Sequence, residues 1–313
     1  MKPAWALKTS AGSTRTWNKK NRLFGEKWKQ SKMLNQLNLY THMWFGRKKT
    51  VLLSLLFPVA TMAVVVWIAG KNMFVNFEDT KSASFIIVCA AIWCGLFNSI
   101  QTIVSDRHDT VLDLRSTNAF CYTGARAILQ TGLVLVQSLI ITLSYTLVKL
   151  NYGHDLPKSG IIFGSVWFEF FVSIFLIMWS SDMMGLMVSG LVKDKSAANT
   201  LAPYILIFEL IFSGLFFDMS GLADKFSYLM ISRWGMQAVG STSRLNSLES
   251  KLQLEHSHLL PEVIKLVKHK PEAAYKATAA HLQQTWLILF AFGLAFFLVT
   301  LLLVSRIKKA AKA

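Results

Sequence analysis

Long apolar runs separated by short polar segments dominate this sequence. Four of these runs contain no Asp, Glu, Lys or Arg over more than twenty residues, at 50–70, 82–104, 127–148 and 282–305. A helix rises about 1.5 Å per residue, so roughly twenty residues cross a hydrocarbon core of about 30 Å. With two further runs that carry acidic residues, the pattern predicts an all-α polytopic membrane protein. Its six transmembrane helices are expected at about 50–70, 82–104, 125–149, 160–192, 196–217 and 282–305.

The polar segments around these runs predict the rest of the architecture. Residues 1–16 are polar and dotted with Lys, which predicts a disordered basic tail. Residues 17–49 interleave bulky apolar with basic residues, which is typical of an amphipathic helix lying in the inner headgroup layer. The membrane-spanning domain at 50–313 then contains a cytoplasmic loop at 105–122 and a long external loop at 218–281. The first part of that external loop is half apolar and too short to span, so we expect a re-entrant segment before the last span.

The net charge of +16 follows the predicted topology. Twelve of the 33 Lys and Arg residues precede Thr50. If both termini are cytoplasmic, 21 basic residues lie inside and 12 outside, and eight of those 12 lie in one long loop where the positive-inside rule is weak. The distribution therefore indicates an integral protein of the cell (inner) membrane with both termini cytoplasmic, and it argues against binding of nucleic acid.

Several classes of enzyme are disfavoured because their motifs are missing from these 313 residues. There is no G-x-x-x-x-G-K-[ST] P-loop, no H-E-x-x-H, no paired-cysteine metal spacing and no serine nucleophile elbow. No His lies within a predicted span, and the three cysteines form no disulfide framework. We therefore expect no catalytic site, no metal site and no cofactor bound by this chain.

Acidic residues within the predicted spans are the first candidates for a functional site. Glu169 falls near the outer headgroups, whereas Asp182 and Glu209 fall at comparable depth on adjacent antiparallel helices. An ionised carboxylate in hydrocarbon costs about 2.5–3.5 kcal/mol even on lenient insertion scales. Two interpretations are open from the residues alone: the acids line a substrate pathway, or they are buried carboxyls that hydrogen-bond to neighbouring helices.

Four stretches resemble the membrane subunit of a type-2 ABC exporter with the topology of the G-subfamily. They are SDRHDTVLDLR (105–115), MMGLMVSGLVKDKSAANTLAP (183–203), LIFSGLFFDMSGL (210–222) and MISRWGMQAVG (230–240). In the first stretch, Asp106-Arg107 and the residues from Thr110 to Asp113 match the family's acidic–Arg and Thr-Leu-acidic pattern, while Asp109 stands where a Gly is usual. The four stretches cover most of the chain between residues 105 and 240.

The resemblance implies a half-transporter that relies on a separate ABC ATPase subunit, which would bind ATP and Mg. Residues 17–49 would form a connecting helix, and the loop after the second span would form a coupling helix that docks on the ATPase. The contacts implied for the connecting helix are Trp17, Phe24, Trp28 and Lys29. Those implied for the coupling helix are Asp106, Arg107, Thr110, Leu112, Asp113 and Arg115.

The resemblance also implies a dimer of permease subunits, either two copies or one copy with a sister chain, around a pathway lined mainly by spans two and five. The pathway candidates are Asn98, Gln101, Asp182, Glu209 and Phe212. For Asn98 and Gln101, hydrogen bonding between helices is the commoner explanation. The substrate implied for such an exporter is amphipathic or hydrophobic, such as a lipid, drug, peptide or glycan. Besides the ATPase and the second permease subunit, membrane lipid is an expected partner.

Two other functions remain open. A proton-coupled secondary transporter would use Asp182 and Glu209 as proton sites. A non-transporting membrane scaffold or sensor would use residues 241–281 as an external receptor domain. Copurification with an ATPase subunit distinguishes the exporter from both.

Overall fold

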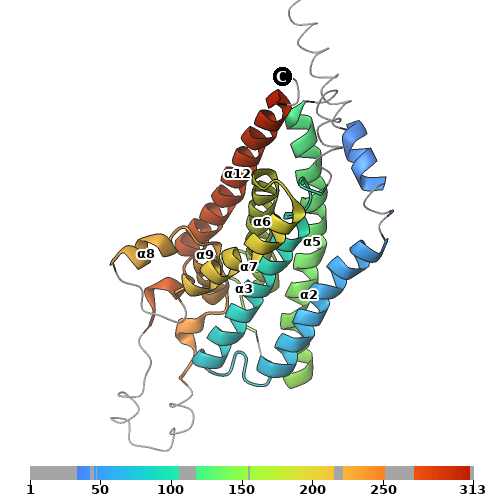
Figure 1. Ribbon diagram of the computed structural model, residues 1–313. Coiled ribbons are helices and arrows are strands. Elements are labelled where there is room, and N and C mark those ends of the chain that lie inside the picture. The colour runs from blue at the N-terminus through green and yellow to red at the C-terminus, as the bar shows by residue number, and fades with distance from the viewer. Residues whose placement is uncertain are drawn as a thin grey trace, which may run out of the picture.

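The computed structural model describes residues 34–42, 46, 48–105, 118–153, 156–214, 221–250 and 271–310. These residues form a bundle of helices (Figure 1). Within them no β-strand occurs, and the one pairing of strand type is an isolated bridge between Asn76 and Glu249. The all-α prediction is confirmed for this part of the chain.

Five of the described helices are long and apolar enough to cross a membrane. They are α2 (Lys48–Ala69), α3 (Phe77–Ser99), α5 (Ala119–Tyr152), α6 (Val166–Leu191) and α12 (Ala279–Ala310). A helix satisfies its own backbone hydrogen bonds, which is why long apolar runs take this form where lipid offers no other partner. The protein is therefore an integral membrane protein.

The helix at the predicted span 196–217 is shorter than expected. It is α7 (Lys195–Ile211), which has 17 residues and contains Pro203. Its N-terminus is fixed by Asp194, whose side chain accepts a hydrogen bond from the Ala197 N–H at 2.8 Å. At about 1.5 Å per residue α7 is about 26 Å long, slightly less than a hydrocarbon core of about 30 Å. The count of six spans therefore stays a prediction.

Capping residues move two helix starts away from the predicted positions. α3 begins at Phe77, five residues before the predicted start, because the Asn76 side chain accepts a hydrogen bond from the Asp79 N–H at 2.8 Å. α6 begins at Val166 and not at residue 160, with Ser165 as its N-cap. In both cases a polar cap, and not the edge of the apolar run, determines where the helix begins.

The centre of the bundle is α6, which contacts α3, α5, α9 and α12. Two glycines let the backbones of α3 and α6 approach closely. A Cβ at Gly95 would lie 2.3 Å from the Met178 carbonyl oxygen, and one at Gly185 would lie 2.6 Å from the Leu96 carbonyl oxygen. Small residues at a crossing allow this kind of contact between membrane helices, so the α3–α6 pair forms the rigid middle of the fold.

The predicted external loop is partly helical. It contains α8 (Gly221–Ser227) and α9 (Ile231–Thr242), followed by the short 3-10 turns η1 (Leu245–Ser247) and η2 (Ala273–Tyr275). α9 is mostly buried against α3, α6 and α12, whereas α8 lies at the edge of the bundle (Figure 1). The half-apolar stretch predicted to be re-entrant thus folds as two short helices.

Polar residues of this predicted external loop attach it to α3. Lys81 of α3 forms a salt bridge with Glu272 at 2.6 Å, and its Nζ lies 5.4 Å from the centre of the Tyr275 ring. Burial raises the pKa of the Tyr275 phenol above its usual range, and the Glu272 carboxylate adds to the effect. Asn246 donates to the Glu272 carbonyl oxygen at 2.8 Å and so ties η1 to the same segment.

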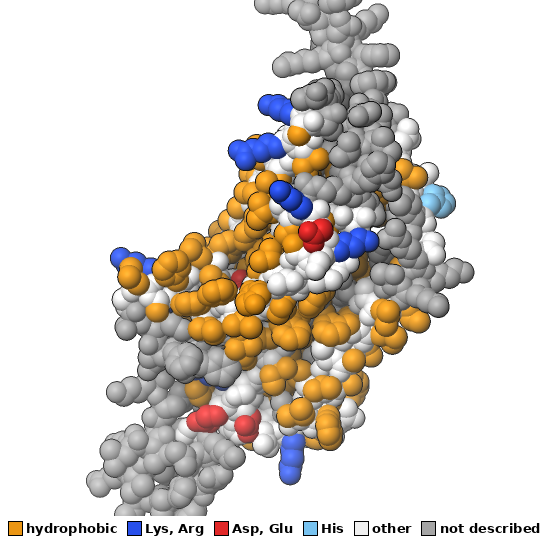
Figure 2. Space-filling model, viewed as in Figure 1, with side chains coloured by type: hydrophobic (Ala, Val, Ile, Leu, Met, Phe, Trp, Pro, Cys, Tyr) orange, Lys and Arg blue, Asp and Glu red, His pale blue; other side chains and the backbone are white. Residues whose placement is uncertain are grey.

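The face of the bundle seen in Figure 2 divides into three zones. Figure 2 shows hydrophobic side chains in a broad band across the middle of the visible face, with charged side chains mostly toward the two ends. The helical residues 34–42 and the C-terminal end of α12 lie at one end, and η2 and the start of α3 lie toward the other (Figure 1). This distribution is typical of a protein whose middle contacts lipid.

Candidate functional site

Asp182 lies where α3 and α6 cross. Its side chain is 0% exposed, and within the described residues neither carboxylate oxygen has a hydrogen-bond partner. The Ser99 hydroxyl donates to the Asp182 backbone carbonyl at 2.5 Å and so links the two helices beside the carboxyl group. A carboxyl group buried within a membrane-spanning helix without hydrogen-bond partners is costly. Of the described intramembrane acids, Asp182 is therefore the one whose presence helix packing does not account for.

A cluster of amide side chains joins three helices around Asn98. The Asn98 side chain donates to the Gln137 side chain at 2.6 Å, and Gln137 donates to the Ser54 carbonyl oxygen at 2.7 Å. Gln130 of α5 donates to the Asn98 carbonyl oxygen at 2.9 Å. These bonds connect α3, α5 and α2, which is what the helix-packing interpretation of Asn98 expects.

Gln101 and Phe212 lie near opposite ends of α7. The exposed Gln101 side chain donates to the Asn199 side chain at 2.5 Å, close to the start of α7. The Phe212 ring stacks on the Phe208 ring, with 6.3 Å between the ring centres. Gln101 is exposed, whereas Phe212 is half-buried and its ring centre also lies 6.4 Å from that of Phe226 in α8.

Glu209 has a defined structural contact. Its carboxylate accepts hydrogen bonds from the backbone N–H groups of Ile231 at 3.2 Å and Ser232 at 2.8 Å, at the start of α9. The Ser232 hydroxyl also donates to the Glu209 backbone carbonyl at 2.5 Å. Met230, the residue at the N-cap position, makes no side-chain capping bond. Glu209 of α7 therefore caps α9, where a negative charge also suits the helix dipole.

The two acids predicted to lie together have different surroundings. Asp182 lies against α3, whereas Glu209 contacts α9. The third acid, Glu169, is also fully buried, and one of its carboxylate oxygens accepts from the N–H groups of Ile162 at 2.6 Å and Phe163 at 2.9 Å. Two of the three intramembrane acids thus stabilise backbone turns, and Asp182 does not.

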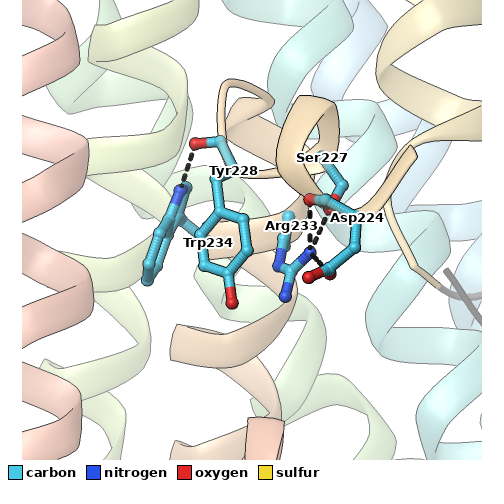
Figure 3. A network of polar contacts seen from close by, with 5 residues as sticks. All are labelled: Asp224, Ser227, Tyr228, Arg233 and Trp234. Atoms are coloured by element: carbon cyan, nitrogen blue, oxygen red, sulfur yellow. Dashed lines mark hydrogen bonds and ion pairs between the residues drawn. The ribbon is translucent and has the colours of Figure 1, made fainter. Parts of the chain in front are cut away.

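An arginine holds α8 against α9 at the edge of the bundle. Arg233 forms a salt bridge with Asp224 at 2.6 Å and also donates to the Ser227 hydroxyl (Figure 3). Its guanidinium lies 3.8 Å from the centre of the Tyr228 ring, and the Trp234 indole donates to the Tyr228 carbonyl oxygen at 2.9 Å. The hairpin is therefore a rigid unit attached to α7 through Glu209.

The sequence that forms most of this bundle matches a known protein family. The profile of the ABC-2 type transporter family matches residues 37–242, well over half of the chain. The protein belongs to the ABC-2 type transporter family. A comparison with curated protein sequences gave no significant match. The resemblance to a type-2 ABC permease is thereby confirmed, and the matched domain is the membrane-spanning part of an ABC transporter.

The residues predicted to bind the ATPase of this ABC-2 type transporter lie outside the described residues. This holds for Trp17, Phe24, Trp28 and Lys29 and for Asp106, Arg107, Thr110, Leu112, Asp113 and Arg115. Sequence reasoning missed two buried or half-buried arginines, Arg126 and Arg233, which contact aromatic rings. The available signal was an arginine close to tyrosines within an otherwise apolar stretch.

Proposed function

We propose that this ABC-2 type transporter is the permease subunit of an ATP-driven exporter of amphipathic or hydrophobic molecules. The family match over residues 37–242 carries the proposal. The 313 residues contain no P-loop, so ATP and Mg would be bound by a separate ATPase subunit. Both termini would lie on the cytoplasmic side of the cell membrane, and α7 would be the fifth of six spans.

The uncovered face of α7 supports a second permease subunit as a partner. The buried residues of α7 follow one stripe, Ala198, Ala202, Leu206 and Glu209. Large apolar side chains on its other faces are exposed, including Tyr204 (58%), Ile207 (52%) and Phe208 (56%). Trp93 and Phe97 of α3 are also exposed. Two permeases, identical copies or sister chains, would meet along α3 and α7 and enclose the pathway between them.

In this arrangement the pathway candidates differ in how they reach the substrate. Gln101 would face the pathway directly, because it is exposed beside the start of α7, and Phe212 would face it with the exposed part of its half-buried ring. Asn98, Asp182 and Glu209 would join it only when α3 or α7 moves, because hydrogen bonds or helix packing now enclose them. If Asp182→Asn and Glu209→Gln together left transport unchanged, the acids would have no part in the pathway.

The decisive experiment is copurification followed by reconstitution. The tagged permease is purified from its native membrane, the ATPase subunit that accompanies it is identified, and the complex is placed in liposomes. We expect ATP-dependent movement of at least one amphipathic compound from a panel of fluorescent phospholipids and dyes, and none with an ATPase whose P-loop lysine is replaced. Transport by the permease without any ATPase would refute the proposal.

A second candidate is favoured by one observation. Asp182 is a fully buried acid within a membrane-spanning helix, and neither of its carboxylate oxygens has a hydrogen-bond partner among the described residues, so a structural role does not account for it and a proton site in a secondary transporter would. In that case a proton gradient without ATP would drive transport, and Asp182→Asn would abolish it. The same liposomes test this, because the gradient can be imposed and collapsed independently of ATP.

A further inference from the structure

Arg126 is a buried charge near the start of α5, only 5% exposed. Its guanidinium lies 4.5 Å from the centre of the Tyr40 ring and 4.7 Å from that of Tyr122. The two rings meet edge to face, with 6.0 Å between their centres. A cation held over aromatic rings away from water is attracted to them more strongly than an exposed one. The contact therefore joins the N-terminal helical residues 34–42 to α5.

The same guanidinium also holds the end of α3. Its Nη1 donates to the Thr102 carbonyl oxygen, in the turn that follows α3. On the other side, the Ser189 hydroxyl of α6 accepts hydrogen bonds from the N–H groups of Ile103 at 2.9 Å and Val104 at 3.1 Å. This turn leads directly into residues 106–117, the segment that includes the predicted coupling helix. Arg126 thus contacts the turn that precedes that segment in the chain.

Tyr40 is the anchor of residues 34–42. Within that segment it is the one buried side chain, at 8% exposed, whereas Leu34 and Leu39 are 55% and 46% exposed. Tyr40 belongs to a small apolar cluster with Ile103, Tyr122, Leu186 and Val304, which come from the turn after α3 and from α5, α6 and α12. The segment is therefore held mainly through a ring that Arg126 covers.

We propose that Arg126, Tyr40 and Tyr122 form a clamp that ties residues 34–42 and the end of α3 to α5, so that both segments move together with the transmembrane helices. The inference rests on the proposed function, in which residues just before 34 and just after 105 contact the ATPase. Arg126 is a positioning residue. A planar guanidinium can donate in its plane while its faces contact rings, and a lysine ammonium cannot do both.

The clamp is tested first in the permease alone, by hydrogen–deuterium exchange. Arg126→Gln and Tyr40→Leu should raise the exchange rate of residues 34–42 by about tenfold. Each removes the desolvated cation–π contact, whose loss makes local opening of this segment about ten times more frequent. Arg126→Lys should give an intermediate rate. Leu39→Ala, a change at an exposed neighbour of Tyr40, is the matched control and should leave the rate as in the wild type. Elution as a single species checks that each variant is folded.

The role in coupling is tested in the complex with its ATPase subunit. In the wild type, ATP with orthovanadate should change the exchange of α3 and α5 relative to the nucleotide-free complex. In Arg126→Gln and Tyr40→Leu this change should fall at least fivefold while ATP hydrolysis continues, and Arg126→Lys should restore part of it. A residue that served only overall stability would not separate hydrolysis from the response of the helices.

Each other outcome counts against the clamp. Unchanged exchange of residues 34–42 in both Arg126→Gln and Tyr40→Leu would overturn the contact itself. Raised exchange with a normal response to ATP and vanadate would overturn its role in coupling. If the wild-type permease shows no ATPase partner or no response, the proposed function fails and the coupling inference falls with it. That failure is recognisable because it appears in the wild type.

Discussion

Replacing Glu209 tests whether this buried acid serves the fold or the pathway. In the structure its carboxylate accepts from the N–H groups of Ile231 and Ser232, and the backbone of both residues is enclosed at the start of α9. Glu209→Ala removes both acceptors. Glu209→Gln keeps one carbonyl oxygen but places an NH₂ group near the second N–H. The alanine variant should therefore be the more destabilised of the two.

The size of the effect follows from the two hydrogen bonds. Loss of an ordinary N-cap costs about 0.5–2 kcal/mol, and a buried donor left unpaired costs about 1–3 kcal/mol. For two donors in a site where Glu209 is 5% exposed, we expect Glu209→Ala to cost about 2–4 kcal/mol and Glu209→Gln about half as much. At about 2 °C per kcal/mol for a chain of this size, the alanine variant should melt about 4–8 °C lower.

The assay is thermal unfolding of the purified permease in detergent at one fixed scan rate, because membrane proteins often unfold irreversibly. Hydrogen exchange at the first turn of α9 gives a local readout. Ser232→Ala is the matched control, since it removes the hydroxyl group that donates to the Glu209 backbone carbonyl and keeps both backbone N–H groups that donate to the carboxylate. It should lower the melting temperature by less than either Glu209 variant.

One result would refute the capping argument. If Glu209→Ala melted within about 2 °C of the wild type and showed normal exchange in α9, yet abolished transport, the carboxylate would act on substrate or protons and not on the helix start. The opposite pattern, a lower melting temperature together with faster exchange at the first turn of α9, is what the two backbone hydrogen bonds to Glu209 predict.

Three further predictions concern packing and polar contacts. Gly185→Ala should lower the free energy of unfolding by about 1–3 kcal/mol, measured by thermal unfolding, because its Cβ would lie 2.4 Å from Ser99 Oγ. Gly132→Ala is the control: a Cβ there would meet nothing within 4 Å, so the change should be neutral or slightly stabilising. Arg233→Lys should raise proteolysis of the α8–α9 hairpin despite the retained charge, because a lysine cannot bind Asp224 and Ser227 and also stack on a ring. Glu272→Gln should cost less than about 1 kcal/mol, and less again in high salt, because its salt bridge to Lys81 is partly exposed.

The positions of the membrane helices could be predicted because the apolar runs are sufficient to specify them. In lipid a helix pairs its own backbone groups, so about twenty apolar residues form a helix whatever lies beside them. This is why α2, α3, α5, α6 and α12 all overlap predicted spans. Their ends were less predictable, since polar caps such as Asn76 and Ser165 determine the first turn.

The family could also be recognised from sequence, because its four motifs are contiguous stretches whose order the chain preserves. The fifth predicted span was too long by contrast, because the apolar run continues past Ile211 while the helix ends there. Hydropathy measures the residues of a run and carries no information about where the backbone turns.

The roles of the polar residues were decided by the tertiary structure. Asp182 and Glu209 look alike in sequence, since each is an acid within a long apolar run. Glu209 reaches the start of α9, more than twenty residues further along the chain, whereas Asp182 meets α3 at a glycine crossing. The role of Arg126 likewise depends on its contacts with the Tyr40 ring and the Thr102 carbonyl oxygen, which come from two other segments of the chain. Whether a segment enters the membrane depends on its hydropathy, which can be summed along the chain. Whether a polar side chain forms a hydrogen bond or a cation–ring contact depends on which distant residue the packing of the helices places next to it.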